Sequence, residues 1–202
     1  MSLTSLAIRP ALIGDEAFVA EMILLSMGHL AEYLFEAEQG SLQKKMSTLV
    51  ARNAGRFGLT LAHVAEVGGK RYGAVLVCKG KNVDRLNLAT FPHLFPSLGV
   101  RLAWMFIWRG MRLPGGREAE ADEYYISNVG VLPSVQGRGV GSALLKFAEE
   151  RAHAEGLKKC SLVVGLYNQD AFRLYQRSGY QVVETVQADN PTLAYHRMLK
   201  VL

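Results

Sequence analysis

The 202-residue chain lacks the features that mark several common classes of protein. Its two cysteines, Cys78 and Cys160, are too few for a disulfide framework and lack the paired spacing of a zinc site, so we expect both to be reduced core residues. No apolar run approaches the roughly 18 residues of a membrane span, because even the conspicuous run at 102–108 is far shorter. Lysine and arginine outnumber aspartate and glutamate by 23 to 18, but the basic residues are scattered, which argues against a nucleic-acid-binding protein.

Two further absences concern targeting and metals. Asp15 and Glu16 interrupt the N-terminal region before a continuous apolar segment forms, so we expect a soluble, cytoplasmic protein with no secretory signal and no transmembrane segment. None of the five histidines stands at a metal-ligand spacing from another ligand, and we therefore predict no metal site. Half of the residues are hydrophobic, which is enough for a substantial core in a chain of this length. We expect a single domain over 1–202.

The periodicity of the apolar residues predicts strands and helices in alternation. Expected strands cover 6–8, 59–67, 72–78, 124–132, 159–164, 180–185 and 193–201, and expected helices cover 15–27, 29–38, 42–54, 140–155 and 170–178. The pair Gly68-Gly69 between two strand patterns predicts a hairpin. Residues 79–122 contain Phe91-Pro92, Phe95-Pro96 and an apolar helix-like piece at 100–111, and we interpret them as an otherwise irregular insertion within the domain.

A glycine-rich segment, Gln-Gly-Arg-Gly-Val-Gly-Ser at 136–142, lies between a predicted strand and a predicted helix. Glycines let the backbone turn tightly, and the first N–H groups of the helix lack intrahelical partners, so the segment suits a phosphate or pyrophosphate. A glycine-rich turn without a ligand is the alternative. Two nucleotide motifs fail: the P-loop lysine is missing before Ser142, and Ser142 or Leu144 stands where the dinucleotide fingerprint needs its last glycine.

A second cluster follows at Asn168, Ala171, Tyr175 and Gly179-Tyr180. Spacings of three and four residues place Ala171 and Tyr175 on one face of a helix that begins near the asparagine. A tyrosine in that position is either a hydrogen-bond donor or acid for a reaction, or a core aromatic residue.

Both clusters, in this order and spacing, resemble the GNAT superfamily of acetyl-CoA-dependent N-acetyltransferases. The family motif is Gln or Arg, two residues, Gly, one residue, then Gly or Ala, and Gln136, Gly139 and Gly141 match it. The stretch 128–133 resembles the family's central strand, and 168–180 resembles its following strand-to-helix segment. The resemblance is dense over 124–183, and it implies a mixed α/β fold. In that fold a mostly antiparallel central sheet is splayed for CoA, with helices on both faces.

The resemblance also implies roles for individual residues. The backbone of Val129 and Val131 would pair with the pantetheine arm like an added strand, and Asn168 would hydrogen-bond the same arm. Tyr175 would lie at the thioester sulfur as the catalytic residue. An ordinary tyrosine is a weaker acid than a thiol, so it would hydrogen-bond the sulfur rather than give up its proton. The full set of residues expected to bind acetyl-CoA is Val129, Gly130, Val131, Gln136, Gly137, Arg138, Gly139, Val140, Gly141, Ser142, Asn168 and Tyr175.

The expected reaction is direct attack of a primary amine on acetyl-CoA in a ternary complex. Two alternatives stay open: acetylation of a protein N-terminus or lysine, and a non-catalytic acyl-CoA-binding regulator. Neither the acceptor amine nor the general base is identified by the sequence, and a water chain is as suitable a base as any carboxylate. The candidate carboxylates are Glu32, Glu36, Glu66, Asp122 and Glu123.

The apolar stretch 102–108 also leaves alternatives open. It suits a helix packed over the sheet edge or substrate cleft, a homodimer contact, or a membrane-surface contact flanked by Arg101, Arg109 and Arg112. Acidic residues that follow it are suited to attract a cationic amine or to form a solvated loop; they are Glu118, Glu120, Asp122 and Glu123.

Overall fold

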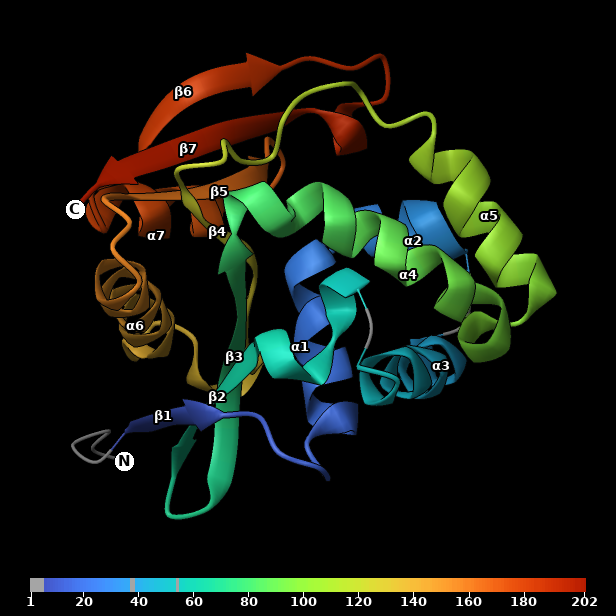
Figure 1. Ribbon diagram of the computed structural model, residues 1–202, viewed down its shortest axis with the longest axis horizontal. Coiled ribbons are helices and arrows are strands. Elements are labelled where there is room, and N and C mark those ends of the chain that lie inside the picture. The colour runs from blue at the N-terminus through green and yellow to red at the C-terminus, as the bar shows by residue number, and fades with distance from the viewer. Residues whose placement is uncertain (1–5, 37–38, 54) are drawn as a thin grey trace.

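A computed structural model describes residues 6–36, 39–53 and 55–202 and contains one seven-stranded sheet (Figure 1). The strands are β1 (Ala7–Pro10), β2 (Ala62–Val67), β3 (Lys70–Lys79), β4 (Tyr124–Val131), β5 (Lys159–Gly165), β6 (Gln181–Val186) and β7 (Tyr195–Val201). Their order is β1-β2-β3-β4-β5-β7-β6, in which β4 and β5 are parallel and the other neighbours antiparallel. This confirms the mixed, mostly antiparallel sheet.

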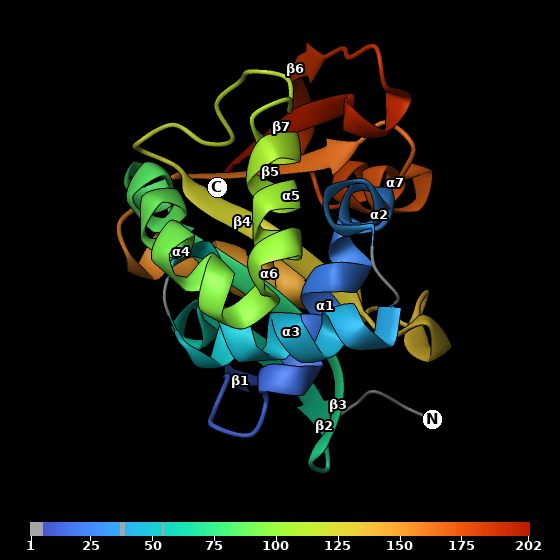
Figure 2. The ribbon, with the colours of Figure 1, turned by 90° about the vertical axis from the view of Figure 1, so that its right-hand side faces the viewer.

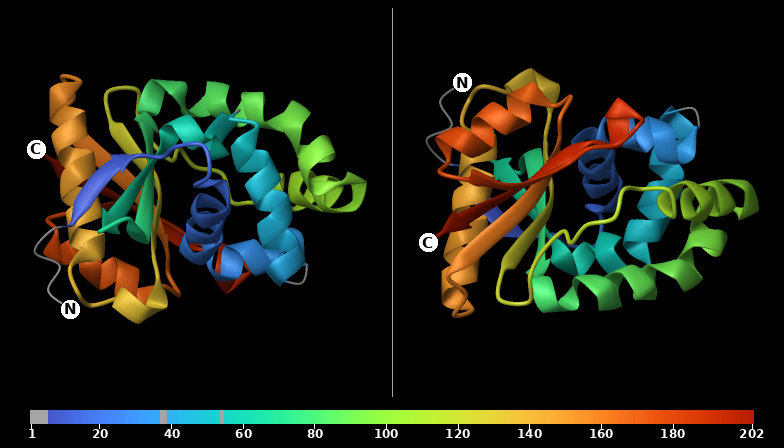
Figure 3. Two further views of the ribbon diagram at one scale, coloured as in Figure 1. Left: turned by 90° about the horizontal axis from the view of Figure 1, so that it is seen from below. Right: turned by 90° about the horizontal axis from the view of Figure 1, so that it is seen from above.

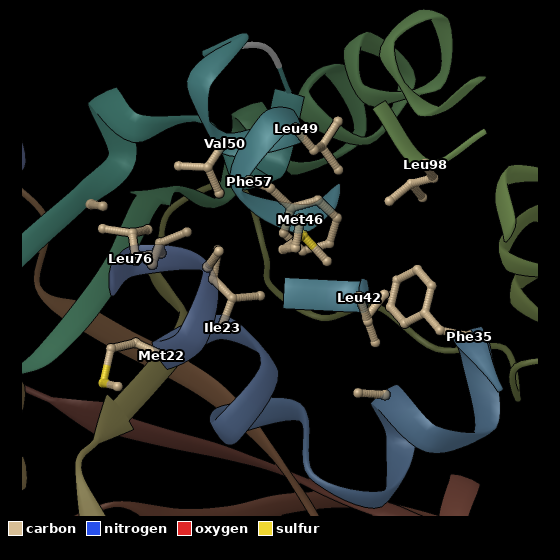
Figure 4. Close-up of a cluster of buried hydrophobic side chains, with 14 of the residues drawn as sticks. Met22, Ile23, Phe35, Leu42, Met46, Leu49, Val50, Phe57, Leu76 and Leu98 are labelled. Carbon is tan, nitrogen blue, oxygen red and sulfur yellow. The ribbon is translucent and has the colours of Figure 1, made fainter. Parts of the chain in front are cut away.

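Helices cover both faces of the sheet (Figure 3). One side carries α1 (Glu16–Met27), α2 (His29–Phe35), α3 (Gln39–Ala51), α4 (Val83–Leu98) and α5 (Val100–Gly110), and the other carries α6 (Val140–Ala154) and α7 (Gln169–Arg177). Each side has its own hydrophobic cluster. In the cluster of Figure 4, Ile23 of α1 lies between Leu76 of β3 and Met46 of α3, and all three residues are fully buried.

The segment 79–122 is more regular than the sequence predicted. It forms α4 and α5, which Figure 2 shows joined at one end; α4 packs against α3, and α5 packs against α2. Pro92 and Pro96 stand inside α4, in a segment that the sequence analysis interpreted as irregular. Both prolines are exposed, whereas Leu94 and Leu98 of the same helix are buried, so water can satisfy the carbonyl groups that the prolines leave without a donor.

The remaining boundaries agree with the sequence to within a few residues. The hairpin turn is at Gly68 and Gly69, with φ angles of 57° and 78°. Predicted helices 29–38 and 42–54 correspond to α2 and α3, and their positions 37–38 and 54 lie outside the described residues. In the described part of the chain, no single helix has the length and hydropathy to cross a membrane, and α1 with α2 meets that criterion only as a pair bent by 103°.

Candidate functional site

The sheet opens between β4 and β5. The two strands pair only where Tyr124–Ile126 lies beside Cys160–Leu162, and both then continue without pairing to each other. In Figure 1, β5, β7 and β6 cross the top of the view, whereas β2 and β3 run down it. A β-bulge lies at the opening, because Leu76 pairs with Asn128 and Val77 with Ile126, leaving Ser127 as the extra residue of β4.

The free edge of β4 presents backbone donors to this opening. The N–H of Leu132 donates to the carbonyl of Tyr72 in β3 at 2.9 Å. Because successive N–H groups of a strand point to opposite sides, those of Val131 and Val129 point away from β3 and into the opening. The backbone N–H groups of Val129 and Val131 are therefore placed as strand addition by an extended ligand requires.

The glycine-rich loop lies between the end of β4 and the start of α6. Gly137 and Gly139 have φ angles of 75° and 88°, a region that favours glycine, and a Cβ built on either would meet nothing within 4 Å. The first bond of α6 runs from the N–H of Ala143 to the carbonyl of Gly139, so the amides of residues 140–142 have no partner within the helix. The tight turn at the two glycines, the open space beside them and the unpaired amides of residues 140–142 together fit a pyrophosphate group at the N-terminus of α6.

Two glycines of the predicted set also allow close packing between elements. A Cβ on Gly130 would come within 2.4 Å of the carbonyl oxygen of Met22, so this glycine lets α1 cross β4 closely. A Cβ on Gly141 would lie 2.9 Å from Leu174, so this glycine brings the start of α6 against α7. Their presence in the motif is explained by close contact between elements, without reference to a ligand.

Asn168 and Tyr175 are both fixed by their surroundings. The side chain of Asn168 caps α7, because its Oδ1 accepts a hydrogen bond from the N–H of Ala171 at 3.1 Å. It also lines a hollow of about 300 Å³ together with Glu32 and Tyr167. Tyr175 is 8% exposed, with its ring 6.3 Å from that of Tyr180, and burial raises the pKa of Tyr175 to about 12.

A larger cavity of about 410 Å³ lies at the opening of the sheet. Ser127 and Asn128 of β4 line it from one strand, and Val163–Gly165 of β5 lines it from the other. Asn128 is held in place by donating to Ser26 Oγ of α1 at 2.8 Å. The helix α5 and the segment after it complete the wall with Phe106, Gly110 and residues 113–116, so the apolar insertion packs over the cleft, as one of the sequence alternatives expected.

The five carboxylates considered as bases all have a basic side chain as partner, and none lines this cavity among the described residues. Glu123 and Arg197 form a buried pair, with oxygens 2.5 and 2.6 Å from Nη2. The other pairs are Glu32 with His29, Glu36 with Arg109, Glu66 with Arg9, and Asp122 with Lys159.

Among the described residues, Glu118 is the carboxylate that lines the cavity. The sequence analysis named Glu118 only as one of four acidic residues that follow the apolar stretch. Its two oxygens accept hydrogen bonds from Arg56 at 3.1 and 2.9 Å. Burial alone would raise the pKa of Glu118, but the Arg56 guanidinium outweighs burial and holds the pKa below its usual value. Tyr125 lies beside the pair, and burial together with the charge of Glu118 raises the pKa of Tyr125 well above its usual value.

Comparison with known proteins agrees with this architecture. The family described as "Acetyltransferase (GNAT) family" matches residues 32–180, and the chain belongs to that family. Among solved structures, an N-acetyltransferase from Staphylococcus aureus Mu50 has a TM-score of 0.74 at 21% identity, over 96% of this chain and 99% of that one. The PaiA N-acetyltransferase from Thermoplasma acidophilum, solved with coenzyme A, has a TM-score of 0.56 at 14% identity, over 98% and 100%.

Curated relatives share a shorter region. The aminoalkylphosphonate N-acetyltransferase of Salmonella typhimurium is 39% identical over 56 residues, which are 28% of this chain and 36% of that protein. The mycothiol acetyltransferase of Brachybacterium faecium is 32% identical over 77 residues, which are 38% of this chain and 22% of that protein. The chain therefore matches about a fifth to a third of the length of these two relatives.

Proposed function

We propose that the chain is an N-acetyltransferase that moves the acetyl group of acetyl-CoA directly to a primary amine in a ternary complex. The observation that carries this proposal is the opening between β4 and β5. There, unpaired strand amides, a glycine-rich helix N-terminus and a cavity occur together. Membership of the GNAT family supports it independently.

In this proposal the chain holds acetyl-CoA by its backbone. The amides of the loop 136–142 bind the pyrophosphate, and those of Val129 and Val131 pair with the pantetheine arm. Asn168 has an amide N–H group left for the same arm, because its capping bond uses only the side-chain oxygen. The acetyl group then arrives in the cavity lined by Ser127 and Asn128.

The amine nitrogen bonds to the acetyl carbon while the carbon–sulfur bond breaks, and a β4 amide stabilises the oxyanion. Deprotonating an ordinary alkylamine at neutral pH costs about 4.6 kcal/mol, so its proton needs an acceptor before attack. We assign that proton to water, because each carboxylate considered as a base already has a basic partner and lies outside the cavity lining. CoA leaves as the thiolate, close to the hydroxyl of Tyr175.

Thermal unfolding with acetyl-CoA tests the proposal. A ligand at about 100 times its Kd should stabilise the fold by roughly 2.7 kcal/mol, whereas ADP and NAD at the same concentration should give a smaller shift because they lack the pantetheine arm. A shift of equal size with all three ligands, or with none, would contradict acetyl-CoA binding at this site. Release of free thiol on adding amines then distinguishes an enzyme from an acyl-CoA-binding regulator.

Tyr175→Phe should lower kcat by about tenfold or more, because the hydroxyl contact matters most as negative charge develops on sulfur. The Kd for acetyl-CoA should change less than threefold or so. With a pKa of about 12, Tyr175 should stay protonated, so its ionisation should cause no loss of rate up to about pH 10. Steady-state rates and acetyl-CoA titrations across pH provide the check, and an unchanged kcat would remove Tyr175 from the mechanism.

A further inference from the structure

The cavity at the opening of the sheet is lined by two charged side chains, Arg56 and Glu118, which are paired with each other. Its acidic wall, which we define as Arg56, Glu118 and Tyr125, combines an ion pair with a buried hydroxyl. Given the proposed acetyl transfer, we infer that the acceptor is a small amine with an apolar body and no anionic group, and that Glu118 accepts a hydrogen bond from its amino group.

The charge of Arg56 is already paired, and three of the five N–H donors of its guanidinium are in use. Besides the two bonds to Glu118, its Nη1 donates to Asn87 Oδ1 at 3.1 Å, and its guanidinium lies 5.8 Å from the centre of the Phe57 ring. No other arginine, and no lysine or histidine, lines the cavity in the described part of the chain. A carboxylate or phosphonate on the acceptor would therefore meet Glu118 without a free cation to balance it.

Glu118, in contrast, has acceptor capacity left. An ionised carboxylate has about four lone-pair sites, and Arg56 occupies two of them. The hydroxyl of Tyr125, a residue only 1% exposed, lies beside this carboxylate. The lone-pair sites of Glu118 that Arg56 leaves free are therefore available to an incoming amino group, which carries the matching donors.

The positive charge of Arg56 also determines whether Glu118 acts as a hydrogen-bond acceptor or as a base. Because the two charges offset each other, the pair orients an amino group without strongly favouring its protonated form. The lowered pKa makes Glu118 a hydrogen-bond acceptor rather than a proton acceptor, which agrees with water as the base. Glu118 is thus a specificity-determining residue.

The rest of the cavity selects the body of the acceptor. Its volume of about 410 Å³ falls at the small end of ligand sites, which span roughly 300–1,000 Å³. Most of the wall is apolar or aromatic and comes from elements far apart in the chain; it includes Leu30, Leu34, Phe57, Phe106, Leu113 and Leu193. Such a wall suits an alkyl or aryl group and offers few partners to a strongly polar one.

The test compares 2-phenylethylamine with phenylalanine, which has the same apolar body and an added carboxylate. For the wild-type chain, we expect kcat/KM to favour phenylethylamine by about 100-fold or more, because the carboxylate of phenylalanine would lose its water in a cavity where Arg56 is already paired with Glu118. Glu118→Gln frees Arg56 and should move the ratio toward phenylalanine by at least about tenfold. Arg56→Gln leaves Glu118 unopposed and should move the ratio in the other direction.

Opposite shifts from the two variants distinguish a role in specificity from damage to the fold, which would lower both rates together. Glu120→Gln is the matched control, since Glu120 is exposed, pairs with Arg117 and does not line the cavity. Equal or better use of phenylalanine by the wild type, or acetylation of neither compound, would overturn the inference. The proposed function is judged separately by the acetyl-CoA thermal shift, which should persist in all three variants.

Discussion

Gly139→Val should abolish the stabilisation of the chain by acetyl-CoA and weaken binding by about 100-fold or more. Gly139 has a φ of 88°, and a β-branched residue there costs of order 1–3 kcal/mol unless the backbone changes conformation. Any such change reorients the amides at the start of α6, which we propose bind the pyrophosphate. Since a Cβ at this position meets nothing within 4 Å, the effect on the apo fold should be modest.

Gly156→Val is the matched control for this prediction. Gly156 follows the opposite end of α6, has a φ of 74° and is equally free of neighbours within 4 Å. The same strain therefore arises outside the loop, and we expect it to reduce thermal stability while the shift produced by acetyl-CoA stays the same. Titration of both variants is the measurement, and tight acetyl-CoA binding by Gly139→Val would place the cofactor elsewhere.

Glu123→Ala should destabilise the fold by about 3–5 kcal/mol, because it leaves the Arg197 guanidinium buried without its partner. The side chains of Glu123 and Arg197 are 4% and 10% exposed, and both Glu123 oxygens contact the same nitrogen of Arg197. Glu123 Oε2 also accepts from the backbone N–H of Glu120 at 2.8 Å, so its loss loosens the chain just before β4. Urea unfolding measures the change.

Replacing both partners separates charge burial from packing. The double variant Glu123→Leu with Arg197→Met should recover at least about half of the lost stability, because no charge is then left buried. If the folded fraction of either variant keeps the wild-type kcat, Glu123 is structural. A loss of kcat beyond the loss of folded protein would return Glu123 to the candidate bases.

Local patterns in the sequence were enough to predict the glycine-rich loop and the helix after it. Gly137 and Gly139 stand between a strand pattern and a helical pattern, and their positive φ angles follow from that position. The regular structure of α4 could not be predicted, because whether Pro92 and Pro96 break a helix depends on which side faces water. That side is set by packing against α3 and α5.

The acidic wall was beyond prediction for a different reason. Arg56 and Glu118 are 62 residues apart, and neither belongs to a motif. Their pairing depends on how the segments before β2 and β4 close over the sheet, which no periodic pattern in the sequence specifies. Gly130 and Gly141 lie in a predicted strand and at the start of a predicted helix, but the sequence does not show that they contact Met22 and Leu174.

The opening between β4 and β5 gives this sheet unpaired strand edges in its interior, in addition to those of its two outer strands. An exposed strand edge ordinarily invites pairing with other chains, and proteins protect such edges to avoid aggregation. Here an additional edge lies in the interior of the sheet, with α1 packed against β4 on one face and α6 on the other. The backbone groups at this edge are therefore free to pair with a thin, extended ligand. The helices on both faces leave too little room for a strand of another sheet to pair there.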